Sequence, residues 1–156
     1  MASFLDPGGT TPLAAERLMP PAVPRVGRRL YWQAAFALVR SVVGLLFIVS
    51  MLVGIPSRGG LVGAADFPIW ATVAVASIRL RRRVRSRRRG TRTAIVAVAA
   101  VAAAFNGLLE VRGVVEFITG VGRVGEIPYN AIGLAVALEL LRVALSADLR
   151  SWYDQP

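Results

Sequence analysis

Nine of the fourteen residues in the segment 79–92, RLRRRVRSRRRGTR, are arginine, and long apolar stretches flank this segment on both sides. Without these nine charges the formal net charge of the chain falls from +10 to +1, so the basicity belongs to one segment. Such a run between apolar stretches is typical of a cytoplasmic loop in a multi-pass membrane protein. The arginines are Arg79, Arg81, Arg82, Arg83, Arg85, Arg87, Arg88, Arg89 and Arg92.

The composition also indicates a membrane protein. Hydrophobic residues make up 55% of the 156 residues, more than a soluble domain of this size can bury. All 19 basic residues are arginine, as in many high-GC bacterial genes, and lysine, histidine and cysteine are absent. Disulfides, thiolate nucleophiles, imidazole bases and Schiff-base lysines are therefore excluded. We expect no enzymatic activity, no metal and no cofactor.

Four apolar segments are predicted to be transmembrane helices, over about 31–54, 61–80, 93–113 and 128–149. About 20 helical residues cross a hydrocarbon core of ~30 Å. The proline-rich residues 1–30 are predicted to be a disordered cytoplasmic tail, and residues 151–156 a short C-terminal tail. The predicted fold class is an all-α integral membrane protein with four transmembrane helices in two hairpins.

The orientation follows from the arginines near the ends of these helices. Fourteen lie on the side of the termini and the central basic loop, and only Arg58 and Arg123 lie on the other. The positive-inside rule predicts a multi-pass protein of the cell membrane with both termini in the cytoplasm. The basic loop should contact anionic lipid headgroups. Nucleic acid is not an expected partner, because segment 79–92 has no aromatic residue to stack on bases.

The two hairpins share a short pattern. Residues 66–71, DFPIWA, and 126–131, EIPYNA, each have an acid, an apolar residue, a proline, two further residues and an alanine. One interpretation is that both segments are helix starts, because a carboxylate complements the helix dipole and a proline in the first turn costs no hydrogen bond. The second interpretation is an ancient duplication of one hairpin.

Charges within the apolar segments are the candidates for function. Arg40 and Glu139 both lie about 14–15 Å from the cytoplasmic ends of their predicted helices. A charge at that depth costs at least ~2.5 kcal/mol to insert, so we expect Arg40 and Glu139 to form an ion pair. Arg142, three residues after Glu139, is a competing partner. Alternatively, both arginines extend to the interface and Glu139 neutralises one of them.

Three further groups of residues are predicted to lie on particular helix faces. Asn106 and Glu110 are one turn apart on the third helix, and either mark its solvated end or line a polar path toward Glu139. Ala97, Ala100 and Ala104 are predicted to allow close packing of the same helix. On the first helix, the face predicted to turn inward carries Gln33, Arg40, Gly44 and Met51.

The segment Val39–Phe47, VRSVVGLLF, is similar to the first helix of DoxX-like small four-helix membrane proteins. The Gly-Lys pair that usually follows in that family is missing here. No function is carried over from this resemblance.

Two functional classes remain. The leading hypothesis is a non-enzymatic accessory, assembly or regulatory subunit that binds another membrane protein, because no nucleophile–base pair, phosphate loop or metal-binding motif is present. The alternative is a small transporter or channel, a homo-oligomer with Arg40 and Glu139 in its path. An enzyme that acts on lipid is the least expected, since it would depend on isolated carboxylates.

Overall fold

The computed structural model describes residues 19–54, 60–86, 88, 90–120 and 126–154. Within these residues the protein is entirely helical, with five α-helices, one 3-10 helix and no strand, which confirms the all-α prediction for them. The elements are α2 (Ala22–Leu52), α3 (Gly60–Arg83), η1 (Val84–Ser86), α4 (Thr91–Ile118), α5 (Glu126–Ala144) and α6 (Ala147–Asp154).

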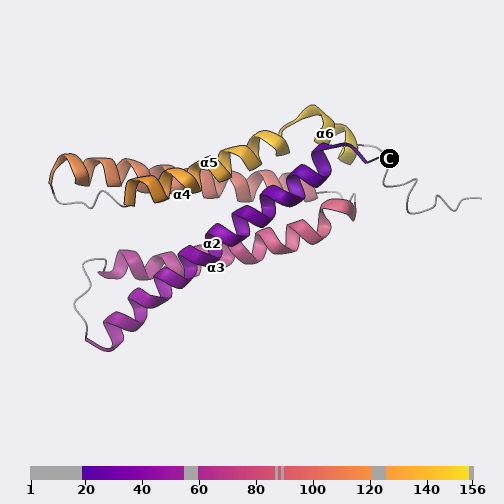
Figure 1. The fold of residues 1–156 in the computed structure, drawn as a ribbon. Coiled ribbons are helices and arrows are strands. Elements are labelled where there is room, and N and C mark those ends of the chain that lie inside the picture. The colour runs from indigo at the N-terminus through magenta and orange to yellow at the C-terminus, as the bar shows by residue number, and fades with distance from the viewer. Residues whose placement is uncertain (1–18, 55–59, 87, 89, 121–125, 155–156) are drawn as a thin grey trace, which may run out of the picture.

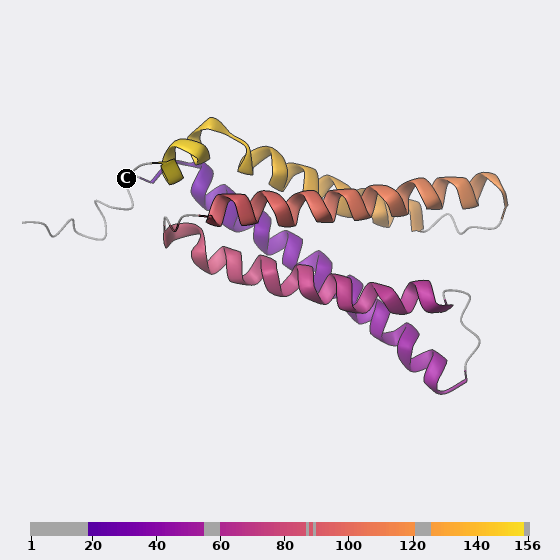
Figure 2. The ribbon, with the colours of Figure 1, turned by 180° about the vertical axis from the view of Figure 1, so that it is seen from behind.

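The four long helices form two antiparallel hairpins, α2 with α3 and α4 with α5 (Figure 1). The hairpins contact each other through α2 and α5 and through α3 and α4. They converge at the end that carries η1 and α6, and they diverge toward the other end (Figures 1 and 2).

The main hydrophobic core lies at the α6 end. It combines apolar side chains from every element, including Leu30, Val84, Ile95, Leu140 and Trp152. A smaller cluster of Ala37, Trp70, Val73, Ala74, Ala102 and Ala137 continues the core between the hairpins. The connection to α6 is further fixed because the Tyr153 hydroxyl donates a hydrogen bond to the Val84 carbonyl oxygen at 2.8 Å. Burial raises the pKa of Tyr153 to about 12, so this donor keeps its proton at neutral pH.

Both predicted tails are partly helical, which corrects the prediction of disorder for the described part of residues 1–30 and the prediction that residues 151–156 follow the last helix. Helix α2 begins at Ala22, inside the predicted tail 1–30, and Val23 and Val26 are buried in the core. The apolar residues at these positions continue the buried face of α2 from Leu30 by about two helical turns toward the N-terminus. Helix α6 likewise extends to Asp154, inside the predicted tail 151–156, and buries Trp152. Residues 1–18 lie outside the described part of the chain.

The last predicted helix is interrupted. Helix α5 ends at Ala144, five residues before the predicted end at Leu149, and α6 begins at Ala147. Ser146 occupies the break, and its hydroxyl accepts a hydrogen bond from the Leu149 amide at 3.4 Å. This is the bond of a serine N-cap, which favours the start of a new helix at this point.

Much of the basic segment is helical, although a loop was predicted. Helix α3 continues to Arg83 and is followed by η1, while α4 begins at Thr91. Leu80 and Val84 are buried four residues apart, and their burial holds this stretch against the core. The positive charges near the C-terminus of α3 also complement its dipole. Arg87 and Arg89 lie outside the described residues.

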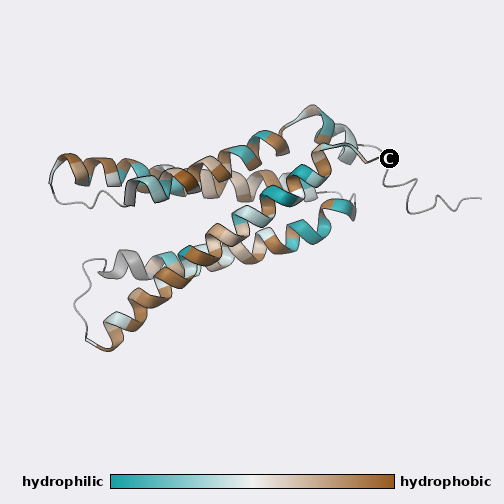
Figure 3. Ribbon diagram, in the orientation of Figure 1, coloured by the Kyte–Doolittle hydropathy of each residue, from teal (hydrophilic) through white to brown (hydrophobic). Residues whose placement is uncertain are grey.

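The exterior of the bundle is apolar. Among the described residues, α2 and α4 are long and apolar enough to span a membrane, with a mean hydropathy of 2.3 and 2.0 over their most apolar windows. Only 22% of each window is buried, whereas the core helix of a soluble protein is buried on most faces. Leu52 and Ile118 are 81% and 76% exposed. In Figure 3 strongly hydrophilic stretches of α2 and α3 lie near the α6 end.

Candidate functional site

Arg40 lies near the middle of α2 and is held by both hairpins. Its Nη2 donates to the Asp66 carboxylate on α3 at 2.8 Å, and its Nη1 donates to the Asn130 side-chain oxygen on α5. The side chains of Arg40 and Asp66 are only 9% and 15% exposed. The guanidinium group therefore connects the α2–α3 hairpin to α5.

Two aromatic rings complete the surroundings of this guanidinium. Its Cζ lies 5.2 Å from the ring centroid of Trp70 and 5.3 Å from that of Tyr129, within the range of cation–π interactions. Phe36 packs against both rings, with centroid separations of 5.9 and 5.1 Å. We refer to Arg40, Asp66, Trp70, Tyr129 and Asn130 as the Arg40 cluster.

The cluster is suited to holding the bundle together. A buried guanidinium without a counter-charge is strongly destabilising, whereas here one carboxylate neutralises it and an amide accepts a further hydrogen bond. The planar guanidinium is always charged and can donate hydrogen bonds in its plane while its faces contact aromatic rings. Arg40 does both, through its bonds to Asp66 and Asn130 and its contacts with Trp70 and Tyr129.

The predicted ion pair between Arg40 and Glu139 is wrong. Glu139 instead contacts Arg142 at 3.2 Å and Arg29 at 3.6 Å, so its competing partner Arg142 is confirmed. The prediction measured depth along the first helix from Tyr31, but α2 begins nine residues earlier, at Ala22. Arg29, which meets Glu139, precedes Arg40 by eleven residues, or about 16 Å of helix.

Asn106 and Glu110 lie on α4, apart from Glu139. Asn106 is fully buried, and its Nδ2 donates to the Ala102 carbonyl oxygen at 2.8 Å. The amide oxygen of Asn106, Oδ1, and one carboxylate oxygen of Glu110 are buried without a hydrogen-bond partner among the described residues. No hydrogen bond or ion pair in this part of the chain joins either residue to Glu139, so the predicted direction of a polar path is not observed.

A close helix contact brings Asn106 next to α5. At Gly133 an added Cβ would overlap the Phe36 ring and Asn106 Oδ1. The absence of a Cβ at Gly133 therefore leaves room beside α5 for the Phe36 ring and the Asn106 side chain. The sequence reasoning missed this contact, because Gly133 lies in an apolar run without any other distinguishing residue.

The predicted inward face of α2 is largely correct. Gln33, Arg40 and Gly44 are buried, but Met51 is 42% exposed, because the hairpins diverge toward that end. On α4 the predicted face is wrong, since Ala97, Ala100 and Ala104 are exposed. The buried face of α4 instead carries Thr91, Ile95, Ala99, Ala102, Asn106 and Gly113.

The two repeated segments of sequence meet at Arg40. Asp66 and Trp70 come from the first segment, and Tyr129 and Asn130 come from the second. The interpretation of both segments as helix starts holds only for the second, because α5 begins at Glu126, whereas α3 begins at Gly60 and contains Pro68 in its interior. The repeat was thus a signal for the partners of Arg40, although sequence reasoning did not identify them.

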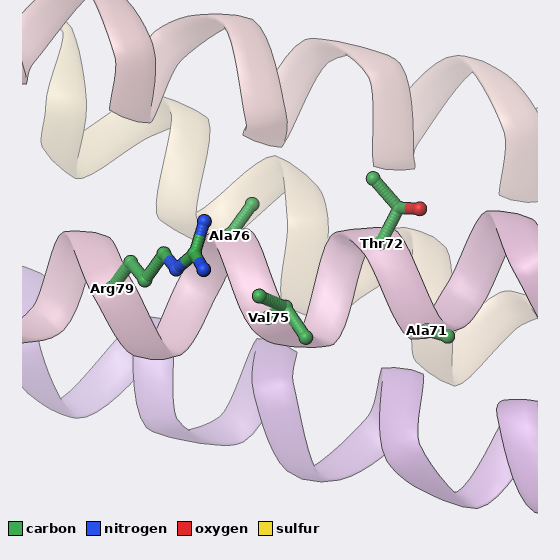
Figure 4. Close-up of a pocket in the computed structure, with 5 residues that line it drawn as sticks. All are labelled: Ala71, Thr72, Val75, Ala76 and Arg79. Carbon is green, nitrogen blue, oxygen red and sulfur yellow. The ribbon is translucent and has the colours of Figure 1, made fainter.

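The surface of α3 and the acidic side chains of the described residues were also candidates for a binding site. A shallow depression on α3 is lined by Ala71, Thr72, Val75, Ala76 and Arg79 (Figure 4). The Thr72 hydroxyl donates to the Pro68 carbonyl oxygen, and Arg79 is the one charged side chain among the described residues of this lining. Among the described residues, no three histidine, cysteine or acidic side chains come together to form a metal site.

The chain matches no protein-family model, and no curated protein or solved structure is significantly similar to it.

Proposed function

We propose that this chain is a multi-pass protein of the cytoplasmic membrane in which α2, α3, α4 and α5 each span the bilayer. The support is the exposed apolar surface of these helices, since soluble monomers rarely expose large contiguous apolar patches. At 24 and 19 residues, α3 and α5 reach about 36 and 28 Å, close to the thickness of a hydrocarbon core. The basic segment and both termini then face the cytoplasm.

Within the membrane, we propose a non-enzymatic role as an accessory, assembly or regulatory subunit of a membrane complex. The observation that carries this proposal is the mutual engagement of Arg40, Asp66 and Asn130. These polar groups satisfy one another across the hairpins and so favour one arrangement of the bundle. The exposed apolar faces of α2 and α4 then remain for lipid and for a partner helix.

A second candidate, a small oligomeric transporter or channel, is favoured by a different observation. Gln33 and Ser77 are fully buried, and their polar side-chain atoms have no hydrogen-bond partner among the described residues. Asn106 Oδ1 and the Tyr129 hydroxyl are also buried without a hydrogen-bond partner among these residues. Buried polar atoms of this kind commonly bind water, and a chain of waters along them would provide a polar path past Arg40.

The proposed topology predicts where reporter fusions are active. Fusions after Arg89 and at the C-terminus should be active as cytoplasmic reporters, and a fusion after Arg58 should be active only as an external reporter. The reason is the excess of arginine at the η1 and α6 end. Fusions of both reporter types at each site serve as mutual controls. An external C-terminus would rule out the four-span arrangement.

The subunit proposal predicts a stoichiometric partner. Full-length protein purified in mild detergent should retain another membrane protein at a constant ratio, as measured by mass spectrometry. The same ratio should be recovered when the tag is moved to the partner, and an unrelated membrane protein of similar size serves as the control. A homo-oligomer without a partner would contradict the subunit role and support the transporter.

A further inference from the structure

A groove of about 640 Å³ lies at the α6 end between the first turns of α2 and the last turns of α3 with η1. Apolar side chains, among them Val23 and Ile78, form part of its lining. Four arginines also line it, Arg28 from α2 and Arg81, Arg82 and Arg85 from the basic segment. The groove therefore combines an apolar wall with a concentrated positive charge.

No carboxylate of the described residues neutralises this positive charge. The lining of the groove includes no carboxylate, and none of its four arginines forms an ion pair within the described residues. Arg81 is instead placed over the ring of Tyr31, with its Cζ 5.1 Å from the ring centroid. This stacking orients the guanidinium without using its N–H donors, which remain free for an anionic ligand.

The position of the groove indicates what kind of anion it binds. Tyr31 and Trp32 lie beside it on α2 and are half exposed, as aromatic residues at a membrane interface are. Leu38 and Val42, seven and eleven residues after Tyr31 on α2, are exposed apolar side chains, as are Val75 and Ile78 of α3. An amphiphile with its anionic group in the groove could therefore lay its acyl chains along α2 and α3.

We propose that this groove is a binding site for one anionic phospholipid of the cytoplasmic leaflet, with the phosphate held by Arg28 and Arg81 and the acyl chains against α2 and α3. Arginine is suited to this role because its planar guanidinium can donate two parallel hydrogen bonds to phosphate oxygens. The inference rests on the proposed membrane insertion. A general attraction of the basic segment to anionic lipid would need no particular site, whereas the proposed lipid binds at one site between α2 and α3.

The test compares two double variants with the same change in charge. Full-length protein in neutral detergent is mixed with phosphatidylglycerol or phosphatidylcholine at equal mole fractions, and native mass spectrometry counts the retained lipid. Wild type should retain one phosphatidylglycerol, and Arg28→Gln/Arg81→Gln should weaken its retention about thirtyfold, from the usual contribution of two interfacial arginines. The control Arg25→Gln/Arg88→Gln alters exposed arginines outside the groove and should remain within about threefold of wild type.

Three results would overturn the site: equal retention of the two lipids, equal loss in the two variants, or displacement of the lipid by inorganic phosphate at an equal phosphate concentration. The last result would assign the arginines to a free anion. Extraction of native membranes with alkaline carbonate tests the proposed membrane insertion independently of the lipid site. Release of the protein by carbonate would contradict membrane insertion, and the lipid site with it. A protein that resists carbonate but shows no lipid preference would contradict the lipid site alone.

Discussion

Replacing Arg40 with leucine should lower the free energy of unfolding by about 3–5 kcal/mol, the usual effect of removing one partner of a buried ion pair. Asp66 would then remain buried with no counter-charge, and Asn130 would lose its donor. Unfolding of the purified protein in mixed micelles, followed by circular dichroism, measures the change. The Arg40→Leu/Asp66→Leu variant should lose less than the two single variants added together, because no charge is left unpaired.

A matched control comes from a second ion pair of the chain. Arg112 and Glu116 also interact, but on the exposed surface of α4, so Arg112→Leu should change the stability by less than about 1 kcal/mol. A further comparison uses Glu139→Leu, whose effect should add to that of Arg40→Leu, since the two residues have different partners. An Arg40→Leu variant as stable as Arg112→Leu would show that the Arg40 cluster does not hold the hairpins together.

The helical class and the burial of Arg40 could be predicted from the sequence, because both depend on local information. Apolar stretches set the approximate positions of the long helices, and the spacing of Gln33, Arg40 and Gly44 placed these residues on one face. Helix ends were less predictable. The start of α2 at Ala22 depends on tertiary burial of Val23 and Val26, which a proline-rich local composition conceals.

The partners of Arg40 could not be predicted by comparing depths along helices. The depth of each charge was counted from the assumed end of its helix. Because the start of α2 was placed too late, Arg40 was paired with Glu139 instead of Asp66. Asp66 was set aside as a helix-start residue, although α3 begins six residues earlier. The packing of α2 against both α3 and α5 determines which side chains meet, and one sequence alone does not specify that arrangement.

At Gly44, α2 and α3 approach so closely that an added Cβ would overlap the backbone of α3. Replacement of Gly44 by alanine is the second large effect that we expect. An added Cβ would lie 2.5 Å from the backbone nitrogen of Phe67 and 2.9 Å from its Cα. Backbone atoms of a packed helix cannot move aside as a flexible side chain can, so the two helices must separate. We expect Gly44→Ala to lower the free energy of unfolding by about 1–3 kcal/mol, as overpacking of a filled core commonly does.

Gly27 provides the control on the same helix, because no atom lies within 4 Å of its added Cβ. Gly27→Ala should be neutral or stabilise the protein by up to about 1 kcal/mol, since alanine is the better helix former. The contact of Gly44 with Phe67 is next to Asp66, so separation of the helices should also stretch the bond from Arg40 to Asp66. Gly44→Ala should therefore lower the free energy of unfolding by less in the Arg40→Leu/Asp66→Leu background than in wild type. If Gly44→Ala changes the stability of the wild-type protein as little as Gly27→Ala does, the close approach of α2 and α3 is contradicted.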